Sequence, residues 1–136
     1  TFVDNKCLLN VELKGHDTSK EAARIIKFYV DKKGWEYKNI IVSSFQEELL
    51  ETVFNINKDI PLGVITENNL EKAKAFAKCI NAVSIHVNYT MLTEEIVEEL
   101  KQNYKVFAFT VNNLNPLARI QSYGVDAIIS DYPDRI

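Results

Sequence analysis

Short runs of β-branched and other apolar residues alternate with longer amphipathic stretches along the chain. The runs predict six strands, at residues 8–13, 40–44, 62–65, 82–87, 106–111 and 127–130. The stretches between them carry apolar residues at helical spacing, which predicts helices at residues 19–33, 46–57, 70–80, 93–103 and 117–123. No low-complexity segment or linker interrupts the series, so we expect a single α/β domain over residues 1–136.

Helix boundaries carry their own signals. Ser19 with Glu21 suggests a capping position at the start of the first helix, and Thr93 is a good N-cap before two glutamates. Gly34 and Gly124 follow the first and last helices, where a left-handed residue is expected to end them. These signals predict where four helix ends lie.

The alternation within two strands separates the possible α/β folds. Leu9, Val11 and Leu13 lie on one face of the first strand, and Asn10 and Glu12 on the other. The run at 82–88 has the same design. An open, doubly wound sheet is covered by helices on both faces and is apolar on both, whereas a barrel strand can turn polar side chains into the lumen. The pattern favours part of a (β/α)₈ barrel over the open sheet.

Bulk composition excludes several classes of function. The net charge is −3, which argues against nucleic-acid binding driven by counterion release. No apolar stretch reaches the ~18 residues of a membrane span. Cys7 and Cys79 are isolated and lack the spacing of a metal or redox motif, so we expect them to be buried free thiols.

Glu12 and Lys14 are the first candidates for chemistry. They lie two residues apart near the end of a strand, so both side chains point the same way. An inward carboxylate beside an inward ammonium needs a partner, water, a metal or an anion. The spacing leaves open a lumen salt bridge or a functional site at the carboxyl ends of the strands.

Six segments, in order, resemble the glycerophosphodiester phosphodiesterase family. The Asn-Val-Glu-Leu-Lys run at 10–14 is similar to the Asn-Ile-Glu-Ile-Lys of that family's third barrel strand, and Ser-Ser-Phe at 43–45 to the end of the fourth. The other similar segments lie at residues 62–64, 83–93, 109–112 and 124–133. The resemblance, closest to cytoplasmic bacterial members, implies an incomplete TIM (β/α)₈ barrel of six parallel βα units corresponding to strands 3–8.

The resemblance also implies an activity. Family members hydrolyse glycerophosphodiesters to an alcohol and glycerol 3-phosphate with a divalent metal, Mg²⁺ or Ca²⁺, and two histidines that exchange protons. By this resemblance Glu12 is a metal ligand, and Lys14 is a catalytic-face lysine that offsets phosphate charge. The alternative is a degenerate, non-catalytic barrel module that binds phosphate esters; a phospholipase-like phosphodiesterase is a third possibility.

Five residues at strand ends are candidate substrate contacts: Ser44, His86, Asn88, Phe109 and Asn112. His86 is either a lumen histidine satisfied by its neighbours or a contact to substrate or metal-bound water. Phe109 replaces the family's Trp and loses the indole donor. Phe45 and Tyr89 are expected to pack, and Asp131 and the His16-Asp17 pair to anchor or cap loops.

The family motifs His-Arg-Gly and Glu-x-Asp of the first two strands do not occur in these 136 residues, and the His16-Asp17 pair follows the Glu-x-Lys strand, in the loop leading to a helix, where the family's His-Asp motif does not lie. We therefore expect those strands to lie outside this sequence, and these residues alone to show little hydrolysis. A partial barrel exposes two strand edges, so a missing N-terminal segment or a homodimer is expected to cover them. The resemblance implies a cytoplasmic enzyme of glycerol and lipid metabolism.

Overall fold

The computed structural model describes Val3 and residues 6–135, and it contains a six-stranded parallel sheet in the order β1-β2-β3-β4-β5-β6. The strands are β1 (Leu9–Glu12), β2 (Ile40–Ser44), β3 (Leu62–Thr66), β4 (Ser84–Asn88), β5 (Lys105–Phe109) and β6 (Ala127–Ile128). The α-helices are α1 (Thr18–Lys33), α2 (Glu47–Ile56), α3 (Leu70–Cys79), α4 (Glu94–Lys101) and α5 (Leu114–Ser122). Short 3₁₀ helices lie at η1 (Tyr37–Asn39), η2 (Tyr89–Met91) and η3 (Pro133–Arg135).

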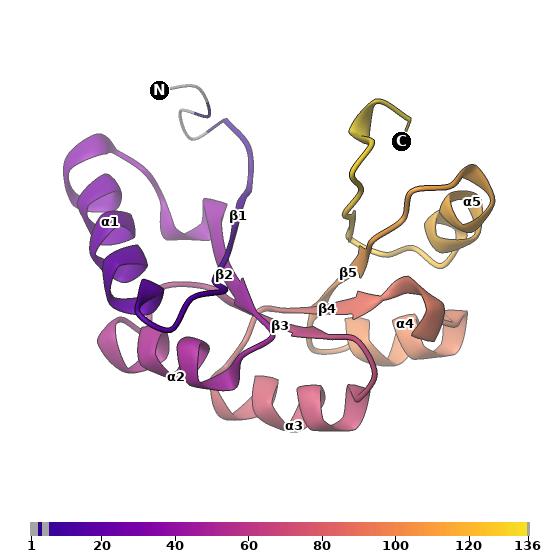
Figure 1. Ribbon diagram of the computed structural model, residues 1–136, viewed down its shortest axis with the longest axis horizontal. Helices are drawn as coiled ribbons and strands as arrows, with labels where there is room; N and C mark the ends of the chain where they lie inside the picture. The colour runs from indigo at the N-terminus through magenta and orange to yellow at the C-terminus, as the bar shows by residue number, and fades with distance from the viewer. Residues whose placement is uncertain (1–2, 4–5, 136) are drawn as a thin grey trace.

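The sheet is strongly curved, and the helices follow its outer side from α1 to α5 (Figure 1). Each strand pairs with the next strand in the sequence, so the described residues form six of the βα units of a (β/α)₈ barrel. β1 and β6 each have one edge without a partner strand among the described residues. The predicted partial barrel is confirmed. The open-sheet alternative is wrong, because no helix of the described residues covers the concave face.

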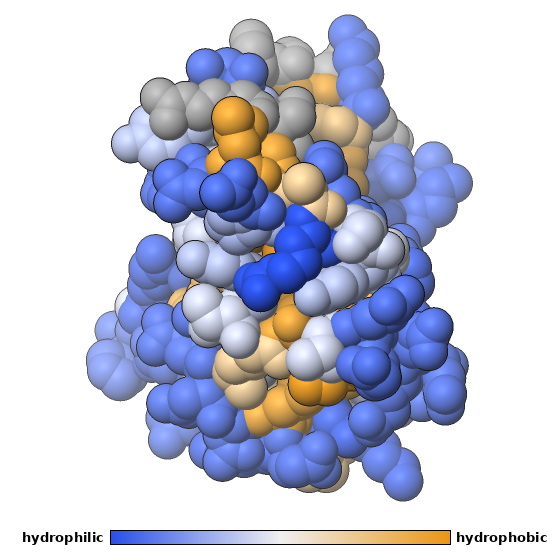
Figure 2. Space-filling model, turned by 90° about the vertical axis from the view of Figure 1, so that its right-hand side faces the viewer, coloured by the Kyte–Doolittle hydropathy of each residue, from blue (hydrophilic) through white to orange (hydrophobic). Residues whose placement is uncertain are grey.

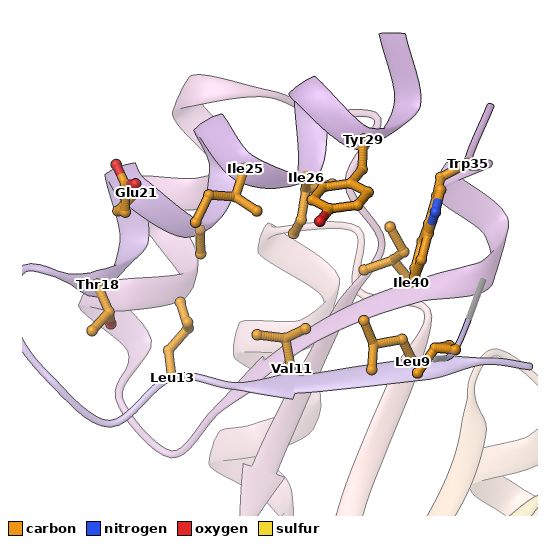
Figure 3. Close-up of a pocket in the computed structure, with 12 residues that line it drawn as sticks. Leu9, Val11, Leu13, Thr18, Glu21, Ile25, Ile26, Tyr29, Trp35 and Ile40 are labelled. Carbon is orange, nitrogen blue, oxygen red and sulfur yellow. The ribbon is translucent and has the colours of Figure 1, made fainter. Parts of the chain in front are cut away.

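The hydrophobic core lies between the sheet and the helices. Leu9, Val11 and Leu13 of the β1 segment point toward α1, where Ile26 and Tyr29 meet them (Figure 3). An apolar groove of about 510 Å³ runs along this contact. Because successive side chains of a strand alternate, the helix-facing positions fix the concave-facing ones. In β1 those are Asn10 and Glu12.

Local boundaries agree with the sequence at several points and differ at others. Gly34 and Gly124 both have φ of 71°, and the Thr93 side chain caps α4 by accepting from the Ile96 amide at 3.3 Å. Ser19 is not a cap: Asp17 is the N-cap residue of α1, and the buried Ser19 hydroxyl donates to the Leu49 carbonyl at 3.0 Å.

Three further expectations need correction. β6 is two residues long instead of the predicted four, and α5 begins at Leu114 instead of residue 117. Pro116 explains the second difference, because the first turn of a helix tolerates a proline. Cys7 and Cys79 are exposed, although buried thiols were expected.

The face of the molecule drawn in Figure 2 is mainly polar. Figure 2, turned to the side of the molecule that carries α5 in Figure 1, shows mostly hydrophilic residues with small apolar patches between them. None of the described helices is long and apolar enough to cross a membrane.

Candidate active site

Glu12 and Lys14 lie together at the carboxyl end of β1, on the concave side. The Lys14 ammonium is 3.5 Å from the Glu12 carboxylate, and the side chains are 78% and 32% exposed, respectively. An exposed ion pair of this length contributes little to stability. The pair therefore has no evident structural role and remains accessible to a ligand.

The loop after β2 holds this segment in place. The Ser44 hydroxyl donates to the Leu13 carbonyl at 2.8 Å, and the Gln46 side-chain amide donates to the Lys14 carbonyl at 2.9 Å. The Ser44 oxygen also accepts from the Gln46 backbone amide at 3.0 Å. These bonds fix the backbone on both sides of Phe45 and the backbone that carries Lys14.

Ser44 therefore lies differently from the expectation for a substrate contact. It is buried, it shares the helix-facing side of β2 with Ile40 and Val42, and its hydroxyl is occupied by protein groups. Its neighbour Ser43 is in register with Glu12 on one side and Gly63 on the other. The Ser43 hydroxyl is buried and has no hydrogen-bond partner among the described residues.

His86 lies deeper on the same concave side. Its ring is 0% exposed, stacks on Phe107 with centroids 4.6 Å apart, and places Nε2 3.0 Å from the Ser84 hydroxyl. Burial lowers the pKa of His86 to about 4, because the charged ring would lose its hydration. Nδ1 has no partner among the described residues. A neutral, enclosed imidazole favours the interpretation as a lumen histidine over a substrate contact.

Gly63 leaves room for the buried pair. A Cβ at residue 63 would come within 2.7 Å of both His86 Nε2 and the Ser84 hydroxyl. Gly63, Ser84 and Ser43 were not among the predicted site residues. The polar alternation of β4 contained the signal for Ser84, since that residue has the same phase as His86.

Asn88 and Asn112 are both committed to local structure. The Asn88 side-chain oxygen accepts from the amide and hydroxyl of Thr90, at 3.1 and 2.9 Å, at the start of η2. The Asn112 side chain donates to Asp131 at 2.8 Å and accepts from the Asp131 amide at 3.0 Å. Asp131 thus anchors the loop after β6 to the end of β5, as the sequence suggested.

Phe109 meets Phe45 at the mouth of the partial barrel. The two rings are 5.7 Å apart and nearly perpendicular, at 88°, which is a favoured edge-to-face arrangement. Phe45 remains 45% exposed, so packing accounts for only part of its ring. Two aromatic rings therefore meet at the carboxyl ends of β2 and β5.

A divalent metal fits Glu12 as one ligand. Its carboxylate is a hard oxygen donor, and Lys14 is its ion-pair partner among the described residues. It lies at the end of the barrel where (β/α)₈ enzymes have their active sites. In Val3 and residues 6–135 no three metal-ligating side chains gather. A metal bound at Glu12 would therefore need its other ligands from outside the described residues or from water.

A partial (β/α)₈ barrel with charged residues at the carboxyl ends of its strands places this protein in the class of (β/α)₈-barrel proteins, whose active sites lie at that end. Within that class, the model of the Glycerophosphoryl diester phosphodiesterase family matches residues 3–135, and the chain belongs to this family.

Relatives and solved structures agree. The chain is 33% identical over 134 residues to YhdW of Bacillus subtilis, whose name describes it as a glycerophosphodiester phosphodiesterase. It is 28% identical over 139 residues to a glycerophosphodiester phosphodiesterase of Caldanaerobacter subterraneus. The two alignments cover 94% and 98% of this chain, but 54% and 55% of the two relatives. The chain thus spans about half the length of these relatives.

A phosphodiesterase of Oleispira antarctica, solved with the product sn-glycerol-3-phosphate, matches with a TM-score of 0.77 and 25% identity. The match covers 95% of this chain and 53% of that one. A Silicibacter pomeroyi structure matches with a TM-score of 0.78 at 23% identity, over 94% and 48% of the two chains, and this supports the fold.

Proposed function

We propose that the full-length protein hydrolyses glycerophosphodiesters to an alcohol and glycerol 3-phosphate with a divalent metal, Mg²⁺ or Ca²⁺. The observation that carries the proposal is the position of Glu12 and Lys14: paired, accessible, and at the carboxyl end of a barrel strand. Family membership and the product bound to the Oleispira antarctica relative support the substrate class.

The two charged residues have distinct roles in this proposal. Glu12 holds the cation, which when bound supplies Lewis acidity toward a phosphodiester oxygen. Lys14 is a point charge that attracts the phosphate and offsets the charge that develops during hydrolysis. The hydrogen bonds from Ser44 and Gln46 keep the Glu12–Lys14 backbone in place. Ser44 and Gln46 are therefore proposed as positioning residues.

The other rim residues take supporting parts. Phe109, with Phe45, is proposed to border the substrate, and Asn88 and Asn112 to shape the loops around it. His86 is proposed to fill the lumen beneath. Further strands of the full-length protein are proposed to pair with the open edges of β1 and β6 and to supply the remaining ligands and proton-transfer groups.

The test is Glu12→Gln in the full-length protein. Glutamine keeps the size of the side chain and removes its charge, so we expect kcat/KM for glycerophosphocholine to fall by about 100-fold. We also expect the Mg²⁺ or Ca²⁺ concentration for half-maximal activity to rise. Glu98→Gln, on the outer side of α4, is the matched control. An unchanged metal requirement in Glu12→Gln would remove Glu12 from the ligand set.

Residues 1–136 expressed alone are expected to show no hydrolysis. Wild-type full-length protein that hydrolyses no glycerophosphodiester under any divalent metal would favour the non-catalytic module instead.

A further inference from the structure

Strand pairing places a serine directly beside Glu12. Glu12 of β1 is in register with Ser43 of β2, and Ser43 is in register with Gly63 of β3. Neighbouring strands lie about 4.8 Å apart. Val42 packs into the core on the helix side, so Ser43 points to the concave side, as Glu12 does. The Ser43 hydroxyl therefore lies next to the residue proposed to hold the metal.

This hydroxyl is a buried donor without an acceptor. The Ser43 side chain is 0% exposed, and its oxygen makes no hydrogen bond to any described residue. Most buried hydroxyls have a partner, because a polar group that leaves water without another hydrogen bond costs free energy. An exception beside a candidate ligand residue points to a bond that forms when the ligand is present.

The other side of Ser43 provides no acceptor. Gly63 has no side chain, and the His86 ring fills the space over it, since a Cβ at residue 63 would lie 2.7 Å from His86 Nε2. That nitrogen already pairs with the Ser84 hydroxyl at 3.0 Å. His86 Nδ1 and the Ser43 hydroxyl both lack partners among the described residues, so they do not bond to each other. The acceptor that remains beside Ser43 is the Glu12 carboxylate.

Backbone hydrogen bonds fix the two residues relative to each other. The Leu13 amide donates to the Ser43 carbonyl at 2.8 Å, and the Leu13 carbonyl accepts from the Ser44 hydroxyl at 2.8 Å. Glu12 directly precedes Leu13, so its backbone is held against β2. Its side chain is less constrained, because it is 32% exposed and its ion pair with Lys14 is long, at 3.5 Å. The carboxylate can therefore turn toward Ser43 while the strands stay in place.

We propose that Ser43 is a positioning residue of the metal site, whose hydroxyl donates to the Glu12 carboxylate when a divalent cation is bound. The Lys14 ammonium is a poor partner for a carboxylate that holds a cation, because both groups are positive. A hydroxyl is neutral, so it can orient the second carboxylate oxygen without opposing the metal. Lys14 is then free to attract the phosphate. This inference rests on the proposed function, in which Glu12 is a metal ligand.

The experiment measures the Kd of Mg²⁺ and of Ca²⁺ by calorimetry on the full-length protein without substrate. We expect Ser43→Ala to raise the Kd of the more tightly bound ion about tenfold, because a metal-ligating carboxylate that loses its hydrogen-bond donor is less well oriented. Ser43→Cys retains a weak donor of similar size and should give an intermediate Kd. Ser84→Ala removes another buried hydroxyl, one that bonds to His86, and is the matched control with an unchanged Kd.

Stability separates positioning from a structural role. Ser43→Ala should not lower the free energy of urea unfolding without metal, because its hydroxyl has no partner among the described residues. A wild-type Kd in Ser43→Ala overturns the inference, and so does a raised Kd that comes with a loss of metal-free stability.

Glu12→Gln, titrated in the same way, distinguishes the two proposals. If Glu12→Gln raises the Kd and Ser43→Ala does not, Glu12 remains a ligand and the inference alone fails. If Glu12→Gln leaves the Kd unchanged, or the wild type binds neither ion, the metal role of Glu12 fails and the inference is overturned with it.

Discussion

Two regions of the same concave face treat polar side chains in opposite ways. At the β1–β2 edge, Glu12 and Lys14 carry charges and are accessible. At the β4–β5 strands, His86 is uncharged and enclosed against Phe107. Both regions come from strands with the same alternation of polar and apolar residues. The difference is that Glu12 and Lys14 lie at the mouth of the partial barrel, whereas His86 lies within its strand and stacks on the Phe107 ring.

The alternation of polar and apolar residues determines which face of the sheet a side chain lies on. Its position along the strand determines whether it keeps its water and its charge. A carboxylate at the mouth keeps its water and can exchange it for a ligand. An imidazole two residues before a strand's end loses that water and stays neutral. Substitutions on the two sides should therefore fall into two kinds: activity changes at Glu12 and Lys14, and stability changes at His86.

The largest expected effect concerns the enclosed side. Its lowered pKa means that His86 takes up a proton in the unfolded chain near pH 6.5 but in the folded protein only near pH 4. The contribution of His86 to the free energy of unfolding is therefore greatest above pH 6.5 and falls by about 3 kcal/mol as the pH decreases to 4. Urea unfolding of the full-length protein between these pH values measures this loss.

His86→Gln isolates this contribution, because glutamine does not titrate. The variant should lose stability more slowly than the wild type between pH 6.5 and 4. His16→Gln, in the exposed turn between β1 and α1, is the matched control for replacing a histidine by glutamine. Identical slopes for the wild type and His86→Gln would mean that the imidazole is protonated in the folded protein, and the contrast between the two regions would disappear.

The next effect concerns the accessible side. Lys14→Met keeps an unbranched side chain and removes the charge, and we expect kcat/KM for glycerophosphocholine to fall about 100-fold. Since the ammonium is exposed and its pair with Glu12 is long, the free energy of unfolding should change by less than about 0.5 kcal/mol.

Lys14→Arg is the matched variant. It should retain more activity than Lys14→Met, because the positive charge remains although its geometry changes. Lys14→Met with wild-type kcat/KM would assign the lysine to the surface and leave Glu12 as the only charged group of the site.

Much of the fold follows from the sequence, because every strand carries a strong apolar run and every helix an amphipathic face. The partial barrel follows from the polar phase of β1 and β4. The missed details have local physical causes. Pro116 is of a type that usually breaks helices, but it lies in the first turn of α5. The two-residue β6 pairs only with β5 among the described strands. The spacing of the two cysteines in the sequence does not indicate that they are exposed.

The positions of candidate site residues were predictable where charge and alternation coincide, as at Glu12 and Lys14. It was not predictable in β2, which is buried on both faces and reads Ile-Ile-Val-Ser-Ser. Such a strand has no alternation, so nothing in the sequence indicates which serine faces inward. The enclosure of His86 likewise depends on Phe107 and Gly63, which lie on the strands beside it.

The smallest expected effect distinguishes the two serines of β2. Ser44→Ala removes the bond to the Leu13 carbonyl and leaves the Gln46 amide without its acceptor, so we expect a loss of about 1–2 kcal/mol in the free energy of unfolding. Ser43→Ala deletes a buried hydroxyl that has no partner in the described structure, so it should be neutral or slightly stabilising. Urea unfolding of both variants in the full-length protein provides the measurement. Equal losses would place a water or another chain segment against Ser43, and a larger loss at Ser43 would reverse the assignment of the two faces on which the Glu12 site depends.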